Sequence, residues 1–274
     1  MSDIQTVINF KQLVTLMNVY TAIATATLTF EVAFISCLIA LPSVGKLGKT
    51  ISEACTRAPG LDLVVLMLVP IPWLIGSWIA GWLGLVAILI GQITAMQLWI
   101  FWHERTHAEA TSGSRIVHFL NKEIGWWRNH LGLWVSTLAL PMFLLIRLSE
   151  ITVYPLLVWI LGFPHYNTGE WVNVSRHKFE GLVGHDLIWC WYCDWMTGVY
   201  SLGAEMLRNV ESFWCPIRFY DGKKCENCKL DFPDLEDGWV EADKKMDDVV
   251  ELMAEKYSDS PHSWFGHPER QGDR

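Results

Sequence analysis

Four long apolar stretches, nearly free of charged residues, dominate the first part of the chain: residues 20–42, 63–80, 81–102 and 131–162. A helix needs roughly 20 apolar residues to cross the hydrocarbon core of a bilayer. The second and third stretches are continuous, so we expect a tight helical hairpin that turns near residues 76–84. Pro70 and Pro72 lie in its first limb, where neighbouring helices must satisfy the backbone groups that proline leaves unpaired.

The stretch 131–162 allows two interpretations. As one helix it would extend for about 48 Å, which is long for a single crossing and short for two. Arg147 and Glu150 lie near its middle on one helical face, between Pro141 and Pro155. The stretch is either one tilted helix that leaves the lipid or two short limbs that meet at an ion pair, and we favour two limbs. Both interpretations predict a mainly α-helical, polytopic membrane protein with four to five membrane helices.

The charge distribution separates two regions. Residues 1–162 hold nine Lys/Arg and eight Asp/Glu, whereas residues 163–274 hold twelve and twenty-one, so their net charges of +1 and −9 sum to −8. This difference indicates a transmembrane domain over 1–162, in a lipid bilayer, and an acidic soluble domain over 163–274. Nucleic acid is excluded as a partner of the acidic region, because phosphate binding requires a basic face.

Basic residues and tryptophans indicate the topology. Lysines and arginines occur in the loops 43–61 and 103–130 and are absent from the hairpin tip, which places both loops in the cytoplasm and the N-terminus outside. The C-terminal domain is then cytoplasmic if the stretch 131–162 crosses twice or re-enters, and this is the location we expect. The chain is tryptophan-rich, with 16 in all, several near predicted helix ends. Residues 114–128 form an amphipathic pattern that predicts a helix in the membrane interface.

The cysteines of the C-terminal domain predict a metal site. Two Cys-x-x-Cys pairs contain Cys190 and Cys193 and, farther on, Cys225 and Cys228, and Cys215 lies between the pairs. Thiolates at this spacing can chelate one soft metal ion. We favour structural zinc held by Cys215, Cys225, Cys228 and one further group. An iron–sulfur site, disulfides in an external domain, and unligated thiols are the alternatives.

A second metal candidate follows the third apolar stretch. His103 and His107 are four residues apart, and Glu104 and His107 form the Glu-x-x-His spacing of di-metal sites in helical bundles. With the histidines farther along the chain, this layout resembles that of membrane desaturases and hydroxylases, whose di-iron centres activate oxygen. The paired His-x-x-His-His boxes of those enzymes do not occur here. We therefore favour His103 and His107 as interfacial polar residues that bond to a carboxylate or to backbone.

Three functions follow from these patterns. The favoured one is an accessory or structural subunit of a larger membrane complex, such as a redox or energy-converting one, with a metal-stabilised C-terminal domain. The tryptophans, the single charges within apolar stretches and an extended C-terminal arm from residue 258 suit packing against protein partners. The alternatives are a histidine-ligated di-iron oxygenase and a thiol–disulfide redox protein that uses Cys190 and Cys193.

Overall fold

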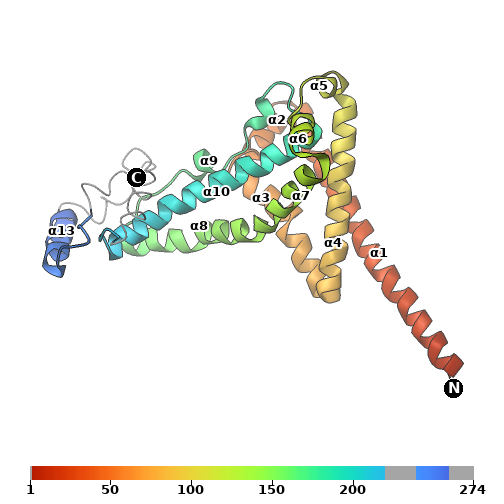
Figure 1. Cartoon of the computed structure of the whole chain (residues 1–274), viewed down its shortest axis with the longest axis horizontal. Helices are drawn as coiled ribbons and strands as arrows, with labels where there is room; N and C mark the ends of the chain where they lie inside the picture. Colours follow the sequence, from red (N-terminus) through yellow and green to blue (C-terminus); the bar gives the residue numbers. More distant parts are fainter. Residues whose placement is uncertain (1, 220–238, 259–274) are drawn as a thin grey trace. The chain divides into compact units, whose positions relative to one another are not determined.

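The computed structural model describes residues 2–219 and 239–258 and is mainly α-helical, as predicted (Figure 1). The chain divides into two compact units. Unit 1 comprises Met1–Gly132 and Asn173–Asp194, and unit 2 comprises Leu133–Val172 and Trp195–Arg274. These boundaries differ from the predicted division between residues 162 and 163, because both units take part of the C-terminal region. Cys225, Cys228 and the predicted arm beyond residue 258 lie outside the described residues.

Three stretches of the described chain are long and apolar enough to cross a membrane. They are Thr15–Ser43, Gly60–Thr106 and Trp126–Leu161. The first two belong to unit 1, and most of the third belongs to unit 2. This supports the coarse prediction of a chain with membrane helices.

In unit 1, helix α1 (Ser2–Ala40) packs along helix α4 (Pro70–Thr106). The contact is close because Gly91 on α4 has no side chain. A Cβ atom there would lie 2.6 Å from the carbonyl oxygen of Ala24 and 2.9 Å from the Cβ of Thr27. Small residues allow helices in lipid to approach until their backbones touch.

The predicted helical hairpin is confirmed. Helix α3 (Gly60–Leu68) leads into α4, whose helical geometry is interrupted at Ala80 and at Gly81, where φ is +61°. Glycine adopts this left-handed conformation without the clash that a Cβ would introduce. The two limbs then meet through Gly76 and Gly84, since a Cβ on Gly84 would collide with the carbonyl oxygen of Gly76.

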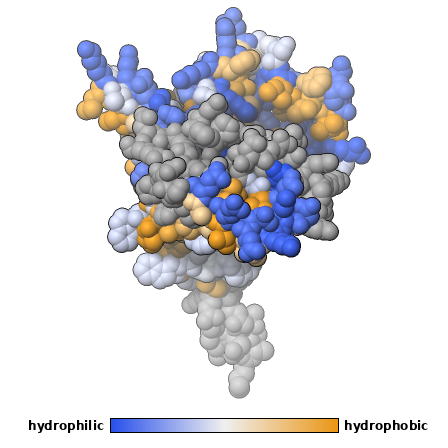
Figure 2. Space-filling model, turned by 90° about the vertical axis from the view of Figure 1, so that its left-hand side faces the viewer, coloured by the Kyte–Doolittle hydropathy of each residue, from blue (hydrophilic) through white to orange (hydrophobic). Residues whose placement is uncertain are grey.

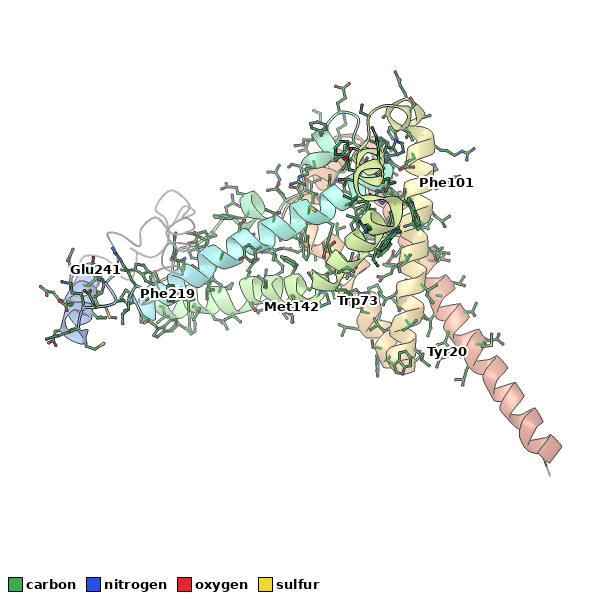
Figure 3. All side chains as sticks on the ribbon, in the orientation of Figure 1. Tyr20, Trp73, Phe101, Met142, Phe219 and Glu241 are labelled. Atoms are coloured by element: carbon green, nitrogen blue, oxygen red, sulfur yellow. The ribbon has the colours of Figure 1, made fainter. Side chains whose placement is uncertain are left out.

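A side chain of the second limb repairs the proline break in the first. Pro72 has no N–H to donate to the carbonyl of Leu68, one turn earlier. The Gln92 Nε2 amide donates to the Leu68 carbonyl instead, at a distance of 2.5 Å. The Gln92 side-chain oxygen in turn accepts the indole N–H of Trp73 at 2.8 Å; Trp73 is labelled in Figure 3. The requirement for a neighbouring helix at these prolines is thus met within the hairpin.

The loops of unit 1 are also helical. Helix α2 (Gly45–Ala54) follows the short turn η1 (Leu41–Ser43), and α5 (Ala108–Ser112) follows α4. The amphipathic segment expected as one helix over 114–128 is divided into α6 (Ile116–Ile124) and α7 (Trp126–Ser136). The division falls at Gly125, whose φ of +89° cannot continue a right-handed helix.

Unit 2 is built on helix α8 (Leu140–Leu161), preceded by the turn η2 (Thr137–Ala139). The favoured interpretation of two short limbs is wrong, because α8 continues unbroken past Arg147 and Glu150. Pro141 stands in its first turn, where the missing N–H would have no partner anyway, and Pro155 is accommodated inside the helix.

Helix α10 (Gly184–Trp214) begins in unit 1, and its part from Trp195 onward packs on α8 in unit 2. The two helices run in the same direction. The Phe143 ring meets Trp195 near the start of α8, and Tyr154 meets Asn209 near its end. Gly203 marks the closest approach, since a Cβ there would lie 2.8 Å from the Ile146 side chain.

The remaining elements of unit 2 are short. Helix α9 (Thr168–Trp171) lies on the return path between α8 and α10, and α13 (Met246–Ser258) follows an isolated bridge between Ile217 and Val240. Figure 2 looks onto the end of unit 2 that carries α13, where hydrophilic side chains gather beside hydrophobic ones. In unit 1 the turn η3 (Arg176–Lys178) precedes α10.

Candidate functional site

The His103-Glu104 pair lies in the last turns of α4, where that helix meets the start of α10. Glu104 Oε1 accepts hydrogen bonds from the backbone N–H of His185 at 3.1 Å and from Arg115 Nη2 at 2.8 Å. Arg115 Nε donates to Asp186 Oδ2 at 3.1 Å. We call Glu104, Arg115 and Asp186 the ion triad of unit 1. Arg115 and Asp186 are buried, with 8% and 7% exposure.

Each carboxylate of the ion triad also binds the start of a helix. Glu104 accepts from the first turn of α10, and Asp186 Oδ1 accepts from the N–H of Val117 in the first turn of α6, at 3.0 Å. The first four N–H groups of a helix have no partner inside it, and the helix dipole favours a negative charge there. A carboxylate in this position stabilises a helix by about 1 kcal/mol. The triad therefore fastens three helices together.

The triad shifts the pKa values of its members. Burial opposes the charged form of Asp186, but its interactions with His185 and Arg115 outweigh burial and hold the pKa of this carboxyl below its ordinary value. Burial likewise opposes the charge on Arg115, and the bonds to Glu104 and Asp186 raise the pKa of the guanidinium above its ordinary value. Both groups are thus held in their charged forms, as an ion pair requires.

The rings of His103 and His107 stack on one another. Their ring centroids are 4.2 Å apart, and the Trp99 ring lies 4.7 Å from that of His103. His103 Nδ1 accepts the N–H of Gly184 at 3.2 Å, and His107 Nδ1 donates to the carbonyl of His103 at 2.9 Å. These are the backbone bonds expected of interfacial polar residues. Among the described residues, no group of three or more His, Cys, Asp or Glu side chains is placed to hold a metal ion.

The described cysteines lie in both units. Cys190 is half-buried and Cys193 is exposed, both in the unit 1 part of α10, whereas Cys215 is exposed in unit 2. Burial raises the pKa of the Cys190 thiol, although Arg176 acts in the opposite direction. A raised pKa disfavours the thiolate that thiol exchange uses. The zinc site built on Cys225 and Cys228 stays a prediction, because those two residues lie outside the described chain.

A second charged cluster lies between α8 and α10 in unit 2, and sequence reasoning found only its Arg147–Glu150 pair. Glu205 and Arg208 are 1% and 0% exposed and form an ion pair within α10 at 2.7 Å. The Arg147–Glu150 pair of α8, also at 2.7 Å, lies against α10, since a Cβ on Gly203 would be 3.1 Å from Glu150 Oε1. We call these four residues, with the polar side chains around them, the charge ladder. The ladder comprises Arg147, Glu150, Tyr154, Tyr166, Glu205, Arg208, Asn209 and Ser212.

Two tyrosines and an asparagine connect the ladder. Asn209 Nδ2 donates to the hydroxyl oxygens of Tyr154, at 3.0 Å, and Tyr166, at 2.5 Å. The Tyr166 hydroxyl donates to Glu205 Oε1 at 3.2 Å, and burial raises the pKa of that phenol. A signal was present in the sequence. Residues 205, 208, 209 and 212 are polar at helical spacing, on a helix otherwise marked by its apolar stripe.

No protein-family model, curated protein or solved structure matches the chain. The class of protein is therefore defined by the fold and the clusters themselves. The part of the chain that the structure describes is mainly α-helical, with three apolar helical stretches that are long enough to cross a membrane, and its buried charged residues lie where helices meet.

Proposed function

We propose that this chain is a multi-pass integral membrane protein that serves as a structural subunit of a larger membrane complex, such as a redox or energy-converting one. The observation that carries the proposal is that apolar side chains are exposed and charged ones are buried, the reverse of their distribution in a soluble protein. Apolar side chains are exposed along the three candidate spans, whereas most residues of the ion triad and the charge ladder are buried. A soluble monomer rarely exposes continuous apolar surface of this extent.

The described residues leave the apolar surface of the three spans largely uncovered. Only 11%, 11% and 6% of the most apolar windows of the three spans are buried within it. Trp78, Trp82 and Trp159 are 90%, 73% and 82% exposed. Tryptophan favours the headgroup zone of a bilayer, so lipid is the first cover for these side chains. Protein partners within the complex are the second.

The topology within this proposal follows the basic loops. Helix α1 and the two limbs of the hairpin each cross the bilayer, and α8 is a fourth helix that is associated with the membrane. The loops 43–61 and 103–130 face the cytoplasm, the N-terminus lies outside, and the C-terminal region lies in the cytoplasm.

The geometry of the two clusters supports a structural role over the two enzymatic alternatives. Glu104, the carboxylate of the di-iron alternative, is engaged by Arg115 and by the start of α10. Cys190, the more buried thiol of the redox alternative, has a raised pKa. The charged residues of both clusters instead hold helices in place, which is what a subunit that supports other proteins requires.

The test is extraction from membranes followed by a mass measurement. Alkaline carbonate is expected to leave the full chain in the membrane pellet, and a mild detergent is expected to release it in a complex much heavier than the 31.4 kDa chain. Release by carbonate would overturn the membrane location. A folded monomer in mild detergent, with its helical circular dichroism intact, would overturn the subunit role alone.

Metal analysis of the same preparation tests the predicted cofactor. One zinc per chain, lost when Cys225 and Cys228 are changed to serine, supports the metal-stabilised C-terminal region. Two irons per chain, lost on His103→Ala and His107→Ala, would instead revive the oxygenase alternative.

A further inference from the structure

Helix α8 has one face that is apolar and uncovered by the described chain. The large side chains along it include Met142 (labelled in Figure 3), Leu148, Leu156 and Trp159, which are 51% to 82% exposed. Charged residues are absent from this face, since Arg147 and Glu150 are buried toward α10. Its two hydroxyl side chains, Ser149 and Thr152, donate back to carbonyls of their own helix.

The opposite side of unit 2 is formed by an irregular segment with exposed polar side chains, which does not suit contact with lipid. After α8 the chain turns at Phe163, which packs on Phe213 near the end of α10. It then runs back along α10, where Tyr166 bonds to Asn209 and Trp171 lies against Gly198. In Figure 1, α9 on this return path and α8 lie on opposite sides of α10. The return path is mostly irregular and exposes His165, Asn167 and Glu170.

The apolar face of α8 and the polar return path on the far side of α10 are incompatible with an α8 that crosses the bilayer. Because α10 runs parallel to α8, a crossing α8 would carry the return path back through the hydrocarbon. Irregular backbone is not tolerated facing lipid, since each unsatisfied N–H or C=O costs several kcal/mol there. Arg147 and Glu150, near the middle of α8, would also stand at the centre of the bilayer, the costliest depth for a charge.

We propose that α8 does not cross the bilayer but lies along its cytoplasmic surface, with the exposed apolar face in the lipid and with α10 and the return path on the water side. The occupant of this face is thus the lipid surface itself. Helices of this kind bury their apolar face to the boundary between headgroups and acyl chains. The inference rests on the proposed membrane location, and it explains how the C-terminal region stays in the cytoplasm although α8 is a single helix.

Paired reporters test the proposal on the full chain in its own membrane. One topology reporter is inserted in the exposed helix α5, within the loop 103–130, and a second follows Arg274. Reporters on the same side support a surface helix, whereas reporters on opposite sides overturn it. The carbonate extraction described above separates this failure from a failure of the proposed function, because a crossing α8 would still resist carbonate.

A depth measurement gives a second, independent outcome. A genetically encoded fluorescent amino acid replaces Met142, Ile151 or Trp159 in turn, and lipids that carry a quencher at two depths report each position. A surface helix predicts similar, shallow depths for all three positions. A result with Ile151 deep and both ends shallow would overturn the proposal. The same replacement at Phe179 is the control. This residue is 73% exposed and precedes α10 in unit 1, so lipid quenchers are not expected to reach it.

Discussion

The two long helix pairs of the molecule are joined by opposite chemistry. Between α1 and α4 the contact depends on close backbone approach at Gly91, and the Thr27 hydroxyl is turned back to the carbonyl of Ile23 at 2.9 Å. Between α8 and α10 the contact contains two Arg–Glu pairs, and Asn209 reaches across to Tyr154.

The surroundings that we propose for each pair account for the difference. In lipid, apolar side chains gain nothing by leaving a solvent that is equally apolar, so helices associate through close packing of small residues. At a water-facing surface, burial of apolar groups drives association and ion pairs can be satisfied as they are buried. The packing of α8 on α10 is thus typical of a soluble protein, and that of α1 on α4 is typical of a membrane span.

The largest expected effect is the loss of Arg208. Arg208→Met leaves the buried Glu205 carboxylate without its cation, and we expect a loss of about 3–5 kcal/mol in the free energy of unfolding. Thermal unfolding of the detergent-solubilised chain, followed by circular dichroism, measures it. Glu205→Leu with Arg208→Met removes both charges and is expected to recover much of the loss.

Arg105→Met is the matched control for this change. Arg105 is exposed and lies over the Phe101 ring, so its replacement is expected to alter stability by less than about 1 kcal/mol. An equal loss from Arg105→Met and Arg208→Met would show that the charge ladder does not hold α8 to α10.

The second-largest effect is expected from adding a side chain at Gly91, where α1 and α4 approach closely. Gly91→Val places a branched side chain against Ala24 and Thr27, which forces α1 and α4 apart and is expected to cost about 1–3 kcal/mol. Gly132→Ala is the control, because nothing lies within 4 Å of a Cβ at that position. If Gly91→Val were neutral in the same unfolding measurement, close backbone packing would not be what joins this pair.

The third effect depends on pH and concerns the ion triad of unit 1. The pKa of Asp186 is lowered in the folded chain, so its contribution to stability is complete above the pKa of an unfolded aspartate, about 4, and is lost as the pH falls through the lower folded value. Asp186→Asn is expected to cost on the order of 1–2 kcal/mol at pH 7 and to flatten the acid limb of the stability curve. An unchanged acid limb would contradict the ionic role of this residue.

The hairpin could be predicted from sequence because its signals are local. The glycines near residue 80 and the two prolines lie within one continuous apolar stretch, and the structure places them as expected. The ion triad could not be predicted, because tertiary contacts bring its members together; Arg115 and Asp186, for example, are 71 residues apart in sequence. The misjudged limbs at 131–162 have the same origin. The length of the stretch and its two prolines favour two limbs that meet at Arg147 and Glu150, whereas in the structure this pair is buried against α10 and the helix stays unbroken.

The smallest effect is expected at Glu31, the acidic residue buried in the α1–α4 pair, with 6% exposure. Lysine and arginine are absent from residues 12–45 and 58–104, so neither helix carries a cationic side chain near this carboxyl. Gln92 interacts with the carboxyl, and glutamine at position 31 can keep that hydrogen bond. We therefore expect Glu31→Gln to change stability by less than about 1 kcal/mol, whereas Glu31→Lys introduces a charge that costs about 3 kcal/mol in a membrane helix. A loss from Glu31→Gln as large as that from Arg208→Met would mean that Glu31 is ionised and paired, and the two helix pairs would then be held by the same chemistry.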